Sequence, residues 1–339
     1  MATHGDRAYT MADHVKRLGP DNKIARIAEI LDQNNPITEH APIFEANNGT
    51  SHTTTVRSAL PKSEWRRLNR GVKPSKSRTT QQDEQTGILE AWSEVDQTLL
   101  DATDDENGVL LSESKPFLQS MKQHMAETLI YGSRGADPAS FNGLHSRYFT
   151  LNKEVKQTAR NVIDMGGTGS DLTSVWLIVW GEMTIHLIHP KGIPLGITNK
   201  VFREQVLFDD DKGQYEGVRS KFSWATGLVL RDWRYVVRLA NIKASNLQDL
   251  LEYGGEDPAK SKLLRALVQG TKLVPDLGDG KPAIYMNRGV NTQLELMAMD
   301  KRNVTLTYEE VDGKPITRFR GIPIHQLDAI IDHEEAVTD

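Results

Sequence analysis

Cysteine is absent from the 339 residues of this sequence. Disulfide bonds, thiolate metal sites and cysteine nucleophiles are therefore excluded, and stability must come from packing and association. Long apolar runs are missing as well, since the longest, residues 175–180, falls far below the ~18 residues of a membrane helix. Charged side chains also interrupt residues 1–20, so the sequence predicts neither a membrane span nor a secretory signal.

A large excess of charge of one sign is missing too. The formal net charge is -5, whereas dedicated DNA-binding domains usually carry a basic surface, so any contact with DNA is expected to be weak and nonspecific. With 38% apolar residues the chain can bury a core, and its length fits either two domains or one elaborated domain.

A basic segment is present at residues 61–77. It holds one acid, Glu64, and six basic side chains, which are Lys62, Arg66, Arg67, Arg70, Lys73 and Lys76. The flanking residues 50–60 and 78–92 have strand-like composition, which predicts a long, protruding hairpin with a basic tip. Because an isolated hairpin is only marginally stable, we expect it to bind a partner subunit. The acidic side chains of residues 101–106 are a candidate electrostatic complement for the tip.

Two segments have the apolar spacing of helices. Residues 23–33 are predicted to form an amphipathic N-terminal helix, whose apolar side chains include Ile24, Ile27, Ile30 and Leu31. Residues 111–131 form the longest predicted helix, with Ser112 or Ser114 as N-cap and Pro116 in the first turn.

The rest of the chain combines strands with short helices. Residues 175–179 and 184–189 are predicted to be buried strands, and residues 221–230 and 234–239 to form a second, antiparallel pair. A closing hairpin is predicted within residues 304–319. Short helices are expected at residues 247–253, 258–268 and 293–299, and an acidic tail at residues 332–339. This combination indicates the α+β class.

The sequence lacks the pattern of a catalytic, cofactor or metal site. Glycine-rich residues 166–170 lack the Lys and Ser/Thr of a phosphate-binding loop. His186 and His189 lie three apart on a predicted strand, so their side chains point to opposite faces. Residues 209–211 lack the alternating acids of a calcium loop. We therefore predict no catalytic residue, no cofactor and no metal, and assign four tryptophans to core packing: Trp176, Trp180, Trp224 and Trp233.

Several short motifs occur in a specific order. Residues 60–71 contain Leu-Pro, then Trp-Arg and Leu-Asn-Arg-Gly; residues 129–132 read Leu-Ile-Tyr-Gly, and residues 138–144 read Pro-Ala-Ser-Phe-Asn-Gly-Leu. His-Pro-Lys-Gly follows at 189–192 and Phe-Arg-Gly-Ile-Pro-Ile at 319–324. In this order the motifs resemble the major capsid proteins of tailed bacteriophages with the Hong Kong 97-type fold, particularly a podovirus-like coat family.

The resemblance implies a division of the chain. Residues 1–46 would be an N-terminal arm and residues 47–95 an extended hairpin loop. Residues 96–160 would form a peripheral domain with a long spine helix, and residues 161–300 mainly an axial domain. Residues 301–339 would return to the peripheral domain and end in the C-terminal tail.

The resemblance also implies a function. The chain would assemble with itself into hexamers and pentamers of an icosahedral head around double-stranded DNA, after synthesis in the host cytoplasm. Portal and scaffolding proteins, and a cement or decoration protein, are the further partners implied, and no membrane is involved. We expect contacts between subunits at Trp65, Arg66, Arg67 and Arg70 of the hairpin, and at Ile24, Ile27, Ile30 and Leu31 of the arm.

Two other functions remain open from the residues alone. A DNA-binding or packaging-associated phage protein would use the basic stretch at residues 62–78 to bind phosphates. An unrecognised α+β enzyme would need a compact pocket with convergent titratable groups, and the sequence shows no such cluster.

Overall fold

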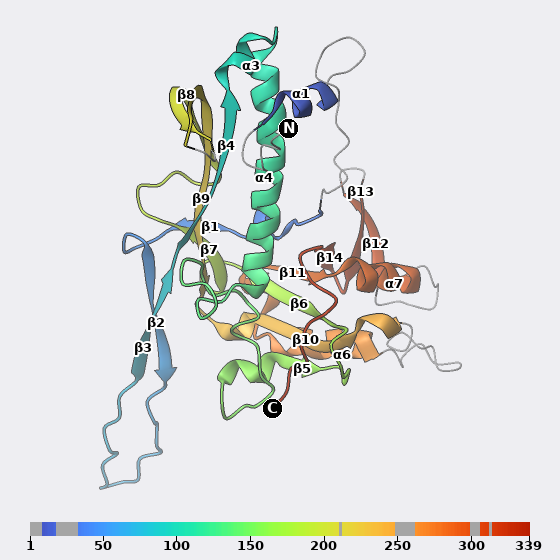
Figure 1. The fold of residues 1–339 in the computed structure, drawn as a ribbon. Coiled ribbons are helices and arrows are strands. Elements are labelled where there is room, and N and C mark those ends of the chain that lie inside the picture. Colours follow the sequence, from blue (N-terminus) through green and yellow to red (C-terminus); the bar gives the residue numbers. More distant parts are fainter. Residues whose placement is uncertain (1–8, 18–32, 210–211, 248–261, 299–305, 312–313) are drawn as a thin grey trace.

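The computed structural model describes residues 9–17, 33–209, 212–247, 262–298, 306–311 and 314–339. Figure 1 shows a body built around one long helix and a large sheet, from which a two-stranded hairpin projects. The helices are α1 (Met11–Arg17), α2 (Ile37–His40), α3 (Gln97–Asp101), α4 (Glu106–Tyr131), α6 (Lys262–Leu273) and α7 (Arg288–Ala298). The strands are β1 (Ile43–Glu45), β2 (Ser51–Ala59), β3 (Arg78–Gln85), β4 (Gly87–Asp96), β5 (Val162–Asp164), β6 (Leu172–Trp180), β7 (Ile185–His189), β8 (Thr198–Phe208), β9 (Gln214–Leu230), β10 (Val236–Lys243), β11 (Lys281–Met286), β12 (Leu306–Val311), β13 (Lys314–Phe319) and β14 (Ile322–Gln326).

Strand β6 lies at the centre of the large sheet. It runs antiparallel to β10 on one side and to β11 on the other, and β14 continues the sheet parallel to β11. All nine residues of β6 are buried, which explains its apolar run at residues 175–180. Trp176 and Trp180 pack into a core beneath α4, whereas Val175 and Leu177 pack into a second core with α6. The assignment of Trp176, Trp180 and Trp224 to the core is confirmed, since each is at most 6% exposed, and the partly buried Trp233 packs against the same core.

Strands β9 and β10 do not pair, so the antiparallel pair predicted at 221–230 and 234–239 is wrong. β9 pairs with β7, β4 and β8, while β10 pairs with β6 and β5. Between them the Asp232 carboxylate accepts from the backbone N–H of Arg234 and starts a short 3-10 turn. Asn161 then donates to the carbonyls of Arg234 and Val236, which fixes the new direction of the chain.

Helix α4 begins five residues earlier than predicted. Asp105 is its N-cap and accepts from the N–H of Gly108 at 2.9 Å, so the expected cap at Ser112 or Ser114 is wrong. Ser114 lies inside the helix, where its hydroxyl donates to the carbonyl of Leu110. Pro116 is also interior, and the helix continues past it because one face packs on the sheet. Phe117 of α4 stacks on Phe222 of β9 at 5.4 Å between ring centroids.

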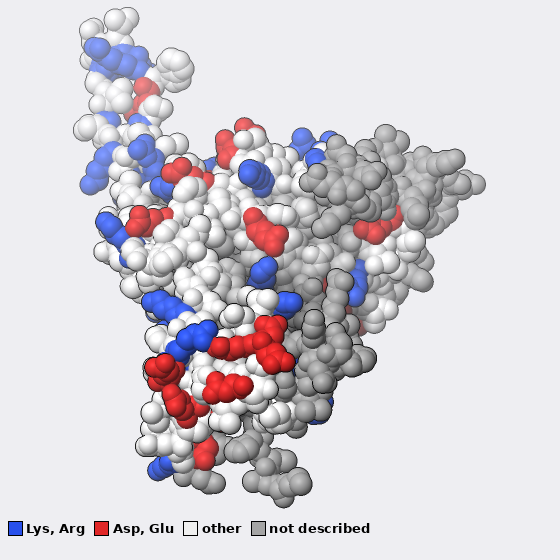
Figure 2. Space-filling view, turned by 90° about the horizontal axis from the view of Figure 1, so that it is seen from above, with Lys and Arg blue, Asp and Glu red and all other residues white. Residues whose placement is uncertain are grey.

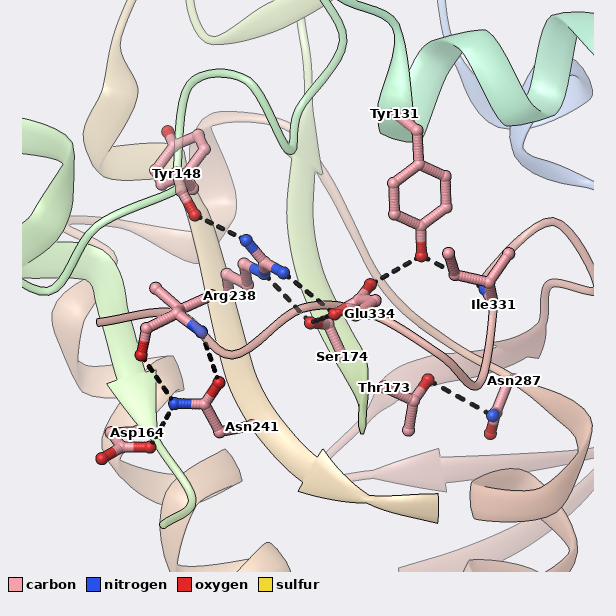
Figure 3. A network of polar contacts seen from close by, with 11 residues as sticks. Tyr131, Tyr148, Asp164, Thr173, Ser174, Arg238, Asn241, Asn287, Ile331 and Glu334 are labelled. Carbon is pink, nitrogen blue, oxygen red and sulfur yellow. Dashed lines mark hydrogen bonds and ion pairs between the residues drawn. The ribbon is translucent and has the colours of Figure 1, made fainter. Parts of the chain in front are cut away.

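The C-terminal tail crosses the sheet as a strap (Figure 3). The Glu334 carboxylate pairs with Arg238 of β10 at 2.9 Å, accepts from the hydroxyl of Ser174 in β6, and accepts from the hydroxyl of Tyr131 at the end of α4. Three residues later Val337 exchanges two hydrogen bonds with the Asn241 side chain. The tail, predicted only to be acidic, therefore joins the long helix to two strands of the sheet.

Other predicted elements have mixed outcomes. The closing hairpin is confirmed by the antiparallel pair β12 and β13. The strand predicted at 78–92 is two strands, β3 and β4, which separate at Thr86. Residues 18–32 and 248–261 lie outside the described residues, so they do not test the helices predicted at 23–33 and 247–253. Among the helices that the structure describes, none is long and apolar enough to cross a membrane.

Candidate assembly surfaces

The tip of the β2–β3 hairpin, residues 60–77, is an irregular segment that contains a turn at Arg67 to Arg70. The N–H of Arg70 donates to the carbonyl of Arg67 at 3.1 Å, and Asn69 adopts a positive φ of 60°, a conformation that Asn tolerates. The Arg66 guanidinium donates to the carbonyl of Arg70, and Ser75 donates across the tip to the carbonyl of Lys62. The tip thus has its own local hydrogen bonds, one of which holds the Arg66 side chain.

Every residue from 57 to 83 is exposed. Trp65 is 101% exposed and Leu68 is 94% exposed, so both large apolar side chains lie fully in water. The predicted contact residues Trp65, Arg66, Arg67 and Arg70 are therefore brought together on one projecting turn, beside three further lysines. Figure 2 shows this basic projection extending away from the body.

The root of the hairpin, by contrast, is held firmly. Arg147 makes two hydrogen bonds to the Glu84 carboxylate of β3, at 2.5 and 2.9 Å, and donates to the carbonyls of Asn142 and Leu228. The two partners of this ion pair are only 14% and 13% exposed. The hairpin is therefore anchored to the body at its root, while its tip is exposed to solvent.

Histidine rings pack against the same root. The ring of His186 in β7 lies edge-on to Phe44 of β1 at 5.0 Å and to His52 of β2 at 5.8 Å. Burial, together with smaller contributions from His52 and Arg231, lowers the pKa of His186 to about 4. His186 is therefore neutral at pH 7. The strands β1, β2 and β7 contact one another through the rings of Phe44, His52 and this neutral histidine.

Acidic side chains gather at the opposite end of the body, at the turn from α3 into α4 (Figure 1). Asp101, Asp104 and Asp105 are exposed there, and Glu106 forms an ion pair with Arg203 of β8. Two of these acids also have structural roles, since Asp101 accepts from Gln97 and Asp105 caps α4. We call residues 101–106 the acidic turn. It lies far from the hairpin tip of its own subunit, so any pairing of the two joins different copies.

Comparison with known proteins identifies the chain. A chain in the structure of bacteriophage Epsilon15 is similar over 100% of both chains, with a TM-score of 0.78 and 32% identity. The bacteriophage JBD30 capsid matches 88% of this chain and 92% of its own with a TM-score of 0.52, and at 10% identity it shows the fold alone. The family described as major capsid protein GP7 matches residues 19–338. The chain belongs to this family. No curated protein matches it.

The GP7-family subunit therefore has the Hong Kong 97-type fold and the α+β class expected from its motifs. It is the major capsid protein of a tailed phage, and its copies assemble into the capsomers of the icosahedral shell. Its place is the virion capsid. A structural role explains why the exposed hairpin, rather than a pocket, is the most unusual surface of the subunit.

The arm contacts predicted for the capsid protein are not among the residues described. Ile24, Ile27, Ile30 and Leu31 all lie within residues 18–32. Among the described residues, no group of three or more His, Asp or Glu side chains could hold a metal ion, and Asp210 and Asp211 lie outside those residues.

Sequence reasoning missed a second exposed surface of the capsid protein. Trp92 of β4 and Phe202 of β8 stack at 6.2 Å between centroids on the face of the sheet opposite α4. Trp92 lies in a segment predicted to be a strand, but β8 was not predicted at all. The stacking of Phe202 on Trp92, a residue more than a hundred positions earlier, leaves no signal in the local sequence.

Proposed function

We propose that the tip of the hairpin is a main contact between neighbouring subunits of the capsomer, with Trp65, Arg66, Arg67 and Arg70 as its contact residues. The observation that carries this proposal is the complete exposure of Trp65 at the end of a hairpin that buries almost nothing of its own. A tryptophan gains most of its binding free energy when a partner removes it from water. The N-terminal arm, through Ile24, Ile27, Ile30 and Leu31, is proposed as a second contact.

Charge reversal tests the tip. Arg66→Glu with Arg67→Glu should leave the subunit folded, because both side chains are exposed and donate no hydrogen bond to the body. Circular dichroism should match the unmodified protein, while electron microscopy should show far fewer closed shells. The matched control is Lys153→Glu with Lys191→Glu, two exposed cations distant from the tip in sequence. Normal shell yields from the Arg66, Arg67 variant would refute the role of the tip.

The division of the chain is proposed as well, and the match to the capsid family supports it. Residues 1–46 serve as the arm, 47–95 as the extended hairpin, 96–160 and 301–339 as the peripheral domain, and 161–300 mainly as the axial domain, in hexamers and pentamers that enclose double-stranded DNA. Portal and scaffolding proteins are proposed as partners during assembly in the host cytoplasm, and a cement or decoration protein afterwards. Co-expression with neighbouring viral genes, followed by electron microscopy of the particles, tests which of these proteins the subunit requires.

The capsid protein is proposed to have no enzymatic activity and only weak, nonspecific contact with DNA. The alternative DNA-binding function makes a distinct prediction, because neutralising phosphates gives a binding constant that falls steeply with salt. Gel-shift titration of the isolated subunit at two salt concentrations separates the two. Tight binding that weakens with salt and disappears in the Arg66, Arg67 variant would favour the alternative.

A further inference from the structure

Two histidine rings, His40 and His325, face each other where the segment before β1 meets the large sheet. His40 is the last residue of α2, and His325 lies in β14, directly opposite Tyr285 of β11. The centroids of the two imidazole rings lie 4.2 Å apart, and the ring planes are inclined by 50°. Side chains from the beginning and the end of the chain thus meet in one contact.

A chain of hydrogen bonds fixes the protonation state of His40. The Trp180 indole N–H donates to the hydroxyl oxygen of Tyr285 at 3.0 Å, and the same hydroxyl lies 3.0 Å from Nδ1 of His40. Burial raises the pKa of Tyr285, which therefore keeps its hydrogen. An indole N–H can only donate, so the Tyr285 hydrogen needs another acceptor, which among the described residues is Nδ1 of His40. His40 is therefore neutral, with its own hydrogen on Nε2.

The surroundings of the two rings disfavour a positive charge on either. Burial lowers the pKa of His40, against a smaller effect of Glu39, which itself pairs with Lys122 of α4 at 3.8 Å. Burial also lowers the pKa of His325 to about 4, with smaller contributions from His40 and from Arg318 of β13. Both histidines therefore remain neutral in the folded subunit at pH 7.

Residues 34–42, which include His40, are fastened to the body before and after this ring contact. The N–H of Asn34 donates to the Asp328 carboxylate at 2.9 Å, and Ile37 is fully buried in the core beneath α4. The segment then leads directly into β1. The His40 ring thus lies at the joint between the proposed N-terminal arm and the sheet.

We propose that His40 and His325 form an acid-sensitive clamp, in which the neutral rings hold residues 34–42 against β11 and β14 and a proton on either ring weakens this hold. Protonation of His40 puts a hydrogen on Nδ1, which then faces the hydroxyl hydrogen of Tyr285. Protonation of His325 places a positive charge against the His40 ring and near Arg318. Mild acid therefore frees the joint of the arm. The clamp is independent of the contact proposed for the hairpin tip.

Hydrogen exchange of the full-length subunit measures the clamp. Protection of the amides in residues 34–42, corrected for the intrinsic exchange rate at each pH, should fall roughly twentyfold between pH 7 and pH 5. This magnitude follows from His325 alone, because its pKa rises from about 4 to the ordinary 6.5 when the segment detaches. Carboxylates ordinarily titrate at about pH 4, so they contribute little in this range.

His40→Asn with His325→Phe gives a clamp that cannot gain a proton. Asn keeps an acceptor close to the position of Nδ1, and Phe keeps a ring in the contact. Protection of residues 34–42 should then hardly differ between the two pH values. The matched controls are His333→Gln, at an exposed histidine of the tail, and His186→Gln, at the hairpin root, and each should retain the fall.

Two results would overturn the clamp: equal protection of the unmodified segment at pH 7 and pH 5, or a fall that persists in the double variant. A fall that disappears in His186→Gln would assign the acid response to the hairpin root instead, and would equally reject the clamp. If circular dichroism shows that the double variant does not fold, His325→Phe alone retains the bond between Tyr285 and His40 and should still remove most of the fall.

Discussion

Arg238 and Glu334 form an ion pair across 96 residues of sequence, with their side chains 0% and 2% exposed. Arg238 also donates to the hydroxyl of Ser174 and to the carbonyl of Tyr148 (Figure 3). The pair therefore joins the C-terminal strap to the centre of the sheet. Removing either partner of a buried ion pair destabilises the fold, because the other charge stays buried without a counter-ion.

Glu334→Ala should destabilise the subunit by about 3–5 kcal/mol, because Arg238 would remain buried without its counter-ion. The measurement is urea unfolding followed by circular dichroism. Glu335→Ala removes an exposed carboxylate from the next position of the same strap and should change the unfolding free energy by less than about 0.5 kcal/mol. Equal effects of the two substitutions would show that the strap contributes through something other than the ion pair.

Glu84→Gln should loosen the hairpin at its root without unfolding the body. The substitution removes a charged partner of Arg147, which keeps its bonds to the carbonyls of Asn142 and Leu228, so a loss of about 1.5–3 kcal/mol is expected locally. Hydrogen exchange should become faster in β2 and β3, with little change in the denaturation midpoint. Glu64→Gln at the exposed tip is the control. Unchanged exchange in β2 and β3 would contradict the role of this ion pair.

Assembly should be sensitive to salt if the basic tip meets acids of a neighbour. Screening lengths fall from about 10 Å at 0.1 M to about 3 Å at 1 M salt, so attraction between exposed charges weakens over this range. Light scattering should show slower shell formation at the higher concentration. The Arg66, Arg67 reversal variant should lose this dependence, and assembly that accelerates with salt in the unmodified protein would point to apolar burial as the dominant attraction.

Acid should destabilise the subunit through His186. Its pKa falls from the ordinary 6.5 to about 4 on folding, so the folded chain binds fewer protons than the unfolded chain between these values. The contribution of His186 to the free energy of unfolding is therefore fully present above pH 6.5. It decreases as the pH falls towards 4, by up to about 1.4 kcal/mol per pH unit. Urea unfolding of His186→Gln should show a smaller decrease between pH 7 and pH 5, and an unchanged slope would exclude His186 as the cause.

Local patterns predicted the elements that depend on local chemistry. The hairpin strands β2 and β3, the long helix α4 and the closing pair β12 and β13 all follow from composition, periodicity and turn residues. The projecting tip with Trp65 and its arginines also follows, because six cations in a short segment cannot form a core.

Contacts between segments distant in sequence determine the features that local patterns could not predict. Strand β10 is buried at seven of its eight positions on both faces, so its pattern of apolar residues does not specify which strand lies beside it. Strand β8 was missed because it is exposed almost throughout and interrupted near Glu204, which has a positive φ of 54°. Glu334 lies in a stretch typical of a solvated tail, and only its distant partners Arg238, Ser174 and Tyr131 explain why it is buried.

The free tip and fixed root of the hairpin also affect how this protein can evolve. A side chain at position 65 or 68 touches almost nothing in its own subunit, so folding places little restriction on it. Selection there acts through whatever the neighbouring copy presents. Related phages should therefore vary the tip and its binding surface together, while Arg147 and Glu84 at the root remain constant.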